Sequence, residues 1–179
     1  MGKINFVFYS MIFLASIVMA GKHTAKEENL YNECDKGNGK YSSCTKLIEI
    51  LSKKCDSGDM TRCSDLGSIL GLELGMREAA FVPLEKSCKA GIAASCFNLG
   101  IHDIAIRGNV KRAAHNYAIA CEKYSERLEK ERIFKLKSCA LKTALENCLR
   151  DQEEHDPVKC AKRAFWEISD KYDSNSTKE

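Results

Sequence analysis

Three features are missing from this chain of 179 residues, and each absence argues against a class of protein. No run of useful length beyond residue 20 alternates apolar and polar residues with the period of a β-strand, so the sequence predicts an all-α fold. No charge of one sign dominates, because 28 Lys and Arg residues stand against 25 Asp and Glu residues, a formal net charge of +3. Proteins that bind nucleic acid need a basic patch, so we expect no nucleic-acid partner.

Cysteine pairs of the Cys-x2-Cys type are also absent, although the chain has ten cysteines. Without such pairs, a zinc or iron–sulfur site is disfavoured, and so is a thiol oxidoreductase. All the cysteines lie after residue 20, at positions 34, 44, 55, 63, 88, 96, 121, 139, 148 and 160. An even number of cysteines in a small exported chain predicts a disulfide framework, with no metal and no cofactor.

The longest apolar run is confined to the first 20 residues. Lys3 supplies a positive start, Phe6–Met19 is mostly apolar, and Ala20 fits the small-residue rule for signal-peptide cleavage. The run is shorter than the roughly 20 apolar residues that a membrane-spanning helix needs. We therefore expect a signal peptide at residues 1–20, secretion or export to the periplasm, and no membrane span after cleavage. Cleavage removes one charge, that of Lys3, so +3 becomes +2.

The region from Cys63 to Cys121 contains an internal repeat with a period of 33 residues. Counted from its first cysteine, each copy has Leu at +3, Gly at +4 and +12, and Cys at +25. The matching positions are Cys63, Leu66, Gly67, Gly75 and Cys88 in one copy and Cys96, Leu99, Gly100, Gly108 and Cys121 in the other. A period of this length is typical of helix-pair repeats, which stack to bury their apolar faces.

Apolar spacing and turn residues predict helices over residues 27–34, 41–55, 60–74, 78–90, 93–106, 110–124, 139–150 and 158–172. Gly67 lies inside one of these helices, where Gly costs about 1 kcal/mol relative to Ala, so we expect the partner helix to approach closely there. The charged insert Glu122–Lys137 interrupts the repeat. It predicts either a lengthened preceding helix or an extra exposed helix.

The expected organisation has four parts. Residues 1–20 are the signal peptide and residues 21–29 a flexible N-terminus. Residues 30–172 form one α/α repeat domain, a short superhelical array whose clearest repeats are 63–95 and 96–128. Residues 173–179 are expected to be a disordered tail.

These motifs resemble the Sel-one-like repeat, and within it the disulfide-bearing Helicobacter cysteine-rich proteins. The shared features are Leu-Gly on the first helix of a pair, Gly before an alanine-rich second helix, and Cys-x7-Cys between repeats. The resemblance is most specific over Cys55–Cys121, whereas the third repeat has Lys142 where Gly is expected. It implies a right-handed α/α superhelix of tetratricopeptide-like pairs. It also implies that each Cys-x7-Cys pair joins the second helix of one repeat to the first helix of the next.

A helical hairpin brings the end of one helix beside the start of the next, within bridging distance of neighbouring cysteines. The predicted disulfides are Cys34–Cys44, Cys55–Cys63, Cys88–Cys96, Cys121–Cys139 and Cys148–Cys160. The last two pairs stay open, because Cys139 and Cys148 can exchange partners. Each bridge closes a small loop and stabilises the fold by roughly 2–3 kcal/mol on the chain-entropy model, so reduction is expected to unfold the array.

The repeat architecture predicts a function in binding. The resemblance implies a concave surface lined by the first helix of each pair. The contact residues predicted on this surface are Ser68, Glu73, Asn98, His102 and Asp103. We expect the partner to be a protein or a ligand derived from the cell wall, and the chain itself to be a monomer.

A hydrolase is the alternative, because proteins of the Helicobacter branch are described as penicillin-binding proteins or β-lactamases. Ser43-Cys44-Thr45-Lys46 matches the Ser-x-x-Lys motif of serine acyl-enzymes, a match also expected by chance in a chain this rich in Ser and Lys. The companion motifs are absent, since Ala144 follows Lys142-Thr143 and Leu66 follows Ser64-Asp65. We therefore predict no catalytic residue.

The histidines are scattered at His23, His102, His115 and His155, and no His-Glu-x-x-His motif is present. One arrangement would bring His102, Asp103 and His115 together on one face. Polar residues of this kind are more often surface or groove-lining side chains, so we predict no metal site.

Overall fold

A computed structural model of the protein describes residues 24–35, 41–125, 127–150 and 156–173. Within these ranges every regular element is helical and no strand occurs, which confirms the all-α prediction. The predicted signal peptide, residues 21–23 of the predicted flexible N-terminus and residues 174–179 of the predicted tail lie outside the described residues.

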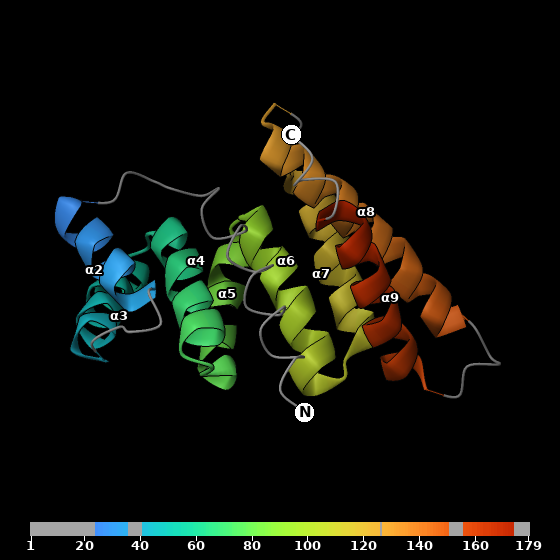
Figure 1. The fold of residues 1–179 in the computed structure, drawn as a ribbon, viewed down its shortest axis with the longest axis horizontal. Helices are drawn as coiled ribbons and strands as arrows, with labels where there is room; N and C mark the ends of the chain where they lie inside the picture. Colours follow the sequence, from blue (N-terminus) through green and yellow to red (C-terminus); the bar gives the residue numbers. More distant parts are fainter. Residues whose placement is uncertain (1–23, 36–40, 126, 151–155, 174–179) are drawn as a thin grey trace. The chain divides into compact units, whose positions relative to one another are not determined.

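Helices follow one another along the described chain with short connections (Figure 1). Their bounds are α2 Ala25–Asp35, α3 Tyr41–Asp56, α4 Met60–Ser68, η1 Ile69–Glu73, α5 Arg77–Lys89, α6 Ala93–His102, η2 Asp103–Arg107, α7 Val110–Lys123, α8 Glu129–Arg150 and α9 Pro157–Asp173. The chain divides into two compact units, Met1–Ile92 and Ala93–Glu179. Each unit is described by itself.

In the first unit, each helix packs against the next one in the chain, in the order α2, α3, α4 and α5. The apolar side chains buried between them include Leu47, Leu51, Ile69, Phe81 and Leu84. Contacts between consecutive helices are what an α/α repeat array uses to bury its apolar faces.

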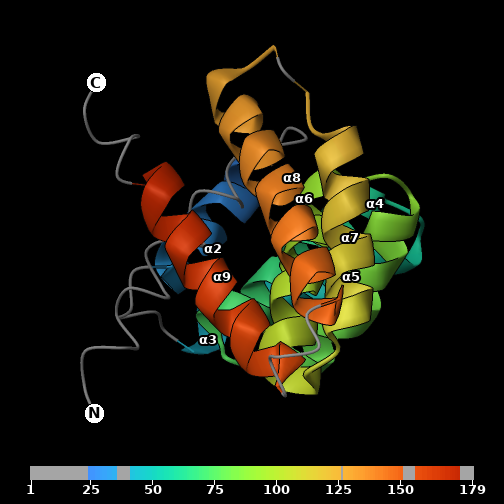
Figure 2. The same cartoon turned by 90° about the vertical axis from the view of Figure 1, so that its right-hand side faces the viewer.

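The second unit is built in the same sequential way, from α6 through α7 and α8 to α9, and α9 also contacts α7 and η2 (Figure 2). Aromatic rings connect its first three helices. The ring centroids of Phe97 and Tyr117 lie 5.5 Å apart, those of Phe97 and Phe134 5.6 Å, and those of Tyr124 and Phe134 5.7 Å. The apolar core is therefore continuous from α6 to α8.

A glycine sets the distance between the two helices of each clear repeat. A Cβ atom at Gly67 would overlap Cγ of Leu84, and a Cβ atom at Gly100 would lie 2.7 Å from Cε1 of Tyr117. The shift of 33 residues that relates the two glycines also relates Leu84 to Tyr117. The predicted close approach of the partner helix at Gly67 is confirmed, and the same contact recurs in the next repeat.

The first helix of each clear repeat ends in a π-helical segment, η1 or η2, rather than continuing as an α-helix as the sequence predicts. A glycine with positive φ follows each segment, Gly75 at 64° and Gly108 at 59°. In both turns a backbone N–H reaches six residues back. Met76 donates to the Leu70 carbonyl at 2.7 Å, and Asn109 donates to the Asp103 carbonyl at 2.9 Å. Glycine suits this left-handed position because it has no Cβ.

The charged insert forms neither of the two predicted structures. Helix α7 ends at Lys123, and Tyr124 then adopts an extended backbone with φ −63° and ψ 134°. The chain re-enters a helix at Glu129, and α8 continues for 22 residues without a break, whereas the sequence predicts a start at Cys139. The absence of Gly and Pro from this stretch allows one long helix. The stacking of Tyr124 on Phe134 holds the reversed chain against α8.

All ten cysteines are disulfide-bonded, and none is free. The bridges Cys34–Cys44, Cys55–Cys63, Cys121–Cys139 and Cys148–Cys160 each join two consecutive helices, which confirms four of the predicted pairs. Cys139 and Cys148 therefore do not exchange partners. The remaining two cysteines, Cys88 and Cys96, are disulfide-bonded as well. A chain with this many disulfides belongs in an oxidising, extracytoplasmic environment.

Candidate functional site

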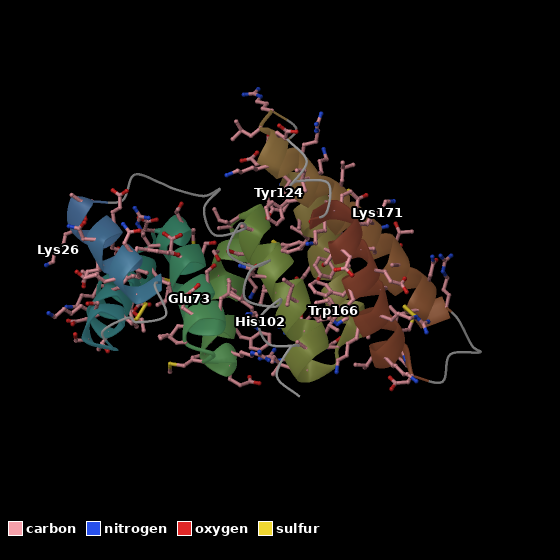
Figure 3. The ribbon with its side chains drawn as sticks, viewed as in Figure 1. Lys26, Glu73, His102, Tyr124, Trp166 and Lys171 are labelled. Carbon is pink, nitrogen blue, oxygen red and sulfur yellow. A yellow bond between two sulfur atoms is a disulfide. The ribbon has the colours of Figure 1, made fainter. Side chains whose placement is uncertain are left out.

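Four of the five predicted contact residues are buried. The exposed fractions are 5% for Ser68, 2% for Asn98, 4% for His102 and 0% for Asp103, whereas Glu73 is half-buried. Figure 3 labels Glu73 and His102. The role of the five residues in binding stays a prediction. The sequence analysis placed these polar residues on a surface, whereas four of them lie in the interior. Asp103 is the clearest example.

Asp103 joins the two helices of its hairpin through both its backbone and its side chain. Its carbonyl accepts the N–H groups of Gly108 and Asn109, which closes the turn after η2. Its Oδ2 accepts a hydrogen bond from Nε of Arg112 at 2.9 Å and another from Nδ2 of Asn116 at 2.8 Å, both on α7. The side chain is therefore a fixed connection between η2 and α7.

Burial raises the pKa of Asp103 above its ordinary value of 3.8, although Arg112 and Asn116 pull in the opposite direction. Burial also raises the pKa of Tyr117 well above its usual value of 10.0, and the nearby Asp103 charge adds to that shift. The phenol of Tyr117 is thus neutral in the folded protein. For Asp103, desolvation outweighs the hydrogen bonds from its partners, so ionising this carboxyl group costs folding free energy.

The first unit holds a different buried carboxylate, Glu27 of α2, which is 1% exposed. Its Oε1 accepts a hydrogen bond from Nζ of Lys54 on α3 at 2.6 Å and lies 3.9 Å from Nε of Arg62 on α4. Its Oε2 accepts bonds from the backbone N–H of Thr24 at 2.8 Å and from the Thr24 hydroxyl at 2.9 Å. Arg62 in turn donates from Nη1 to Asp65 at 2.8 Å. One carboxylate therefore connects three consecutive helices.

The surroundings of Glu27 act on its pKa in opposite directions. Burial raises the pKa, but the hydrogen bonds from Lys54 and Thr24 together outweigh burial and lower it from 4.5 to about 2. Glu27 is therefore ionised in the folded protein, and its charge stabilises the packing of α2 on α3 and α4.

The Ser-x-x-Lys motif lies on α3, where Ser43 is 5% exposed and Lys46 is exposed to solvent. The Ser43 hydroxyl donates to Oε2 of Glu33 on α2 at 2.5 Å, and the adjacent Cys44 forms the disulfide to Cys34. In this arrangement Ser43 helps to attach α2 to α3, and its hydroxyl is directed to a carboxylate rather than to Lys46.

The structure separates the residues that were considered as a metal site. His102 and Asp103 are buried, whereas His115 is exposed on α7. His23 and His155 lie outside the described residues. Among the residues whose positions are described, no group of three or more His, Cys, Asp or Glu side chains could hold a metal ion.

Sequence reasoning missed the partners of both buried carboxylates. A signal for one of them was present, because Arg112 and Asn116 are spaced i and i+4 and so share one face of α7. No comparable signal existed for Glu27, whose partner Lys54 is 27 residues away on another helix.

Comparison with known proteins yields no relative. No protein-family model, curated protein or solved structure matches this chain. Among its described helices, none combines the length and apolar character needed to cross a bilayer.

Proposed function

We propose that this protein is an extracytoplasmic binding scaffold of the Sel-one-like repeat type. The observation that carries the proposal is the pair of equivalent hairpins, α4–α5 and α6–α7, whose glycine contacts recur at the same offset. This equivalence supports a repeat array, and the Leu-Gly and Cys-x7-Cys motifs favour the Sel-one-like type. The N-terminal sequence supports export as a secreted or periplasmic protein.

Binding is the function that such an array performs best. Stacked helix pairs offer long surfaces with regularly spaced residues, and the disulfides keep these surfaces rigid in the unbound protein. A rigid surface loses little conformational entropy on binding, so more of the contact energy becomes affinity. The partner class that we propose is a protein or a fragment of the cell wall.

Among the predicted contact residues, we propose Glu73 as a direct contact, because its side chain on η1 is partly exposed to solvent whereas the other four are buried. The buried residues Ser68, Asn98, His102 and Asp103 would support the surface from below. Asp103 does so by fixing η2 against α7.

The test is a binding screen of the oxidised protein against purified muropeptides and a library of random peptides, followed by calorimetry of each hit. Saturable binding that disappears on reduction of the disulfides is expected. Absence of saturable binding to any member of either set would contradict the proposal.

An assay for turnover of a chromogenic β-lactam by the same preparation distinguishes a binding scaffold from a hydrolase. We expect no turnover above that of the Ser43→Ala variant. The Ser43 hydroxyl is buried and donates to Glu33, so it is poorly placed to attack a substrate. Turnover that Ser43→Ala abolishes would replace the scaffold with a serine acyl-enzyme.

A further inference from the structure

Among the described disulfides, the bridge between Cys121 and Cys139 is the only one in which both residues reach solvent. Each of these cysteines is half-buried. The other disulfide-bonded cysteines are buried, with at most 7% exposed, except for Cys160, which is half-buried and pairs with the buried Cys148. Exposed disulfides are the labile ones, because a thiolate has to reach a sulfur atom in order to attack it.

Exposure of both residues also matters for the sulfur that is expelled. Thiol–disulfide exchange releases one cysteine of the bridge as a thiolate, and this anion is disfavoured in apolar surroundings. An attack on Cys160 would expel the thiolate of Cys148, which is 4% exposed. At the Cys121–Cys139 bridge, either thiolate is released at a position that water reaches. Solvation therefore favours exchange at this bridge over the Cys148–Cys160 bridge.

The position of each cysteine in its helix decides which sulfur is the better leaving group. Cys121 lies in the last turn of α7, where the free carbonyl groups carry a partial negative charge and disfavour an anion. Cys139 lies in the middle of α8, away from both ends of the helix. The thiolate is therefore released more easily from Cys139, and the attack is directed to Cys121.

The packing of α8 against α7 does not depend on this bridge alone (Figure 2). Tyr124, which follows α7, stacks on Phe134 of α8, and Phe134 also meets Phe97 of α6. The Cα atoms of Cys121 and Cys139 lie 4.9 Å apart. When the bridge is open, the ring contacts keep the two cysteines near each other, so the same bridge can form again.

We propose that the Cys121–Cys139 bridge is a site of reversible modification by small thiols. The thiolate of the small molecule attacks Sγ of Cys121, its electron pair forms a new S–S bond, and the bond to Cys139 breaks. The electron pair of the broken bond leaves on Sγ of Cys139, which takes up a proton from water. The products are a mixed disulfide at Cys121 and a free thiol at Cys139, with no net oxidation or reduction.

The reverse step needs no further reactant. The Cys139 thiolate attacks the mixed disulfide, releases the small thiol and restores the bridge. The protein thus carries an adduct beside the end of α7 while thiols are present and loses it when they are removed. This thiol-dependent state does not rest on the proposed binding function.

Mass spectrometry maps the site on the unmodified sequence. The oxidised protein is incubated with reduced glutathione, and samples taken over time are quenched with N-ethylmaleimide and digested without reduction. We expect a glutathione adduct on Cys121 and an alkylated thiol on Cys139. Both should appear at least about tenfold faster than modification of any other cysteine.

Reversal and a pair of matched variants test the two halves of the proposal. After removal of free glutathione by gel filtration at neutral pH, the adduct is expected to decay as the bridge forms again. The variant Cys121→Ser, Cys139→Ser should take up no glutathione on the same time scale. The matched control Cys148→Ser, Cys160→Ser, which removes the other bridge of α8, should still form the adduct on Cys121. Circular dichroism checks that both variants are folded.

Three outcomes would overturn the inference, and the map of the wild-type protein decides it even where a variant does not fold. The first is an adduct that appears earliest at any cysteine other than Cys121, or at all bridges at one rate, as expected if exchange follows global unfolding. The second is a Cys121–Cys139 bridge that glutathione leaves intact. The third is an adduct that persists after gel filtration, because Cys139 would then be out of reach. None of these results depends on the ligand screen, so the inference and the proposed function fail separately.

Discussion

The two units of the molecule each bury a carboxylate, but they do so with opposite energetic consequences. Glu27 in the first unit has its pKa lowered to about 2, since its hydrogen bonds outweigh burial. Asp103 in the second unit has its pKa raised, since burial outweighs Arg112 and Asn116. One carboxylate stabilises the fold when it is ionised, and the other carries a penalty. Burial alone therefore does not decide whether the pKa of a carboxyl group is raised or lowered. The direction depends on how completely hydrogen-bond partners replace the water that the group loses on folding.

The helical hairpins of the two units differ in another way. The glycine at the helix crossing is the same in both hairpins, but the side chain that packs on it is different. Gly67 and Gly100 hold equivalent places, yet Gly67 contacts Leu84 whereas Gly100 contacts Tyr117. The larger tyrosine also reaches Phe97, and Phe97 reaches Phe134 of α8. The glycine fixes how closely the helices approach, and the facing side chain decides how far the core extends.

Removing a disulfide from each unit should give the largest effects. Replacing Cys121 and Cys139 by Ala opens a bridge that spans 18 residues, and replacing Cys34 and Cys44 opens one that spans 10. On the chain-entropy model each loss costs about 3 kcal/mol, slightly more for the longer loop. Urea denaturation of each double variant measures the cost. A loss below about 1 kcal/mol at both sites would show that the bridges do little to constrain the unfolded chain.

Adding a methyl group at the helix crossings is expected to have the next largest effect. Gly100→Ala should destabilise the protein by about 2 kcal/mol, because the new Cβ would overlap the Tyr117 ring. Gly67→Ala is expected to cost less, because the Leu84 side chain is more flexible than an aromatic ring, although the Leu84 backbone nitrogen at 3.3 Å limits the relief.

A double-mutant cycle sharpens this comparison. In a Tyr117→Ala background, Gly100→Ala should become neutral or stabilising, since alanine is the better helix former by about 1 kcal/mol once the ring is gone. Thermal unfolding of the four proteins measures the coupling. An unchanged cost of Gly100→Ala in the Tyr117→Ala background would mean that the ring is not what requires glycine.

Neutralising Glu27 should reduce stability at neutral pH by about 2 kcal/mol, less than for a fully buried pair because Lys54 is 37% exposed. The folded pKa of about 2 lies below the unfolded 4.5, so the contribution is complete above pH 4.5 and is lost as the pH falls toward 2. Denaturation of wild type and Glu27→Gln across this range should give curves that converge in acid. A constant difference between them would show that the charge of Glu27 is not responsible.

Neutralising Asp103 should have the smallest effect at neutral pH, a change within about 1 kcal/mol, because Asn removes the desolvation penalty together with the bond to Arg112. The folded pKa is raised above 3.8, so the penalty is absent below pH 3.8 and grows as the pH rises through the folded value. Relative to wild type, Asp103→Asn should therefore gain stability as the pH rises, opposite in sign to Glu27→Gln. The same sign for both variants would contradict the contrast between the two units.

The amino-acid sequence by itself determined the all-α class, the order of most helices and the disulfide pairs Cys34–Cys44 and Cys55–Cys63, whereas the pairing of Cys121, Cys139, Cys148 and Cys160 was left open. Apolar spacing, turn glycines and neighbouring cysteines are local features, and the contacts that they predict join consecutive helices. The close contact at Gly67 also followed from sequence, because a costly glycine inside a helix needs a packing reason.

Only the tertiary structure decided which polar groups are buried and where α8 begins. Lys54 and Arg62 reach Glu27 from other helices, and Tyr124 meets Phe134 across a reversal of the chain. Periodicity shows which face of a helix is apolar, but it does not show which side chains from elsewhere will complete a buried charge. Whether each ionised carboxylate stabilises or destabilises the fold depends on those partners. Desolvation and hydrogen bonding have large and opposite effects, and both are set by the full surroundings of the group.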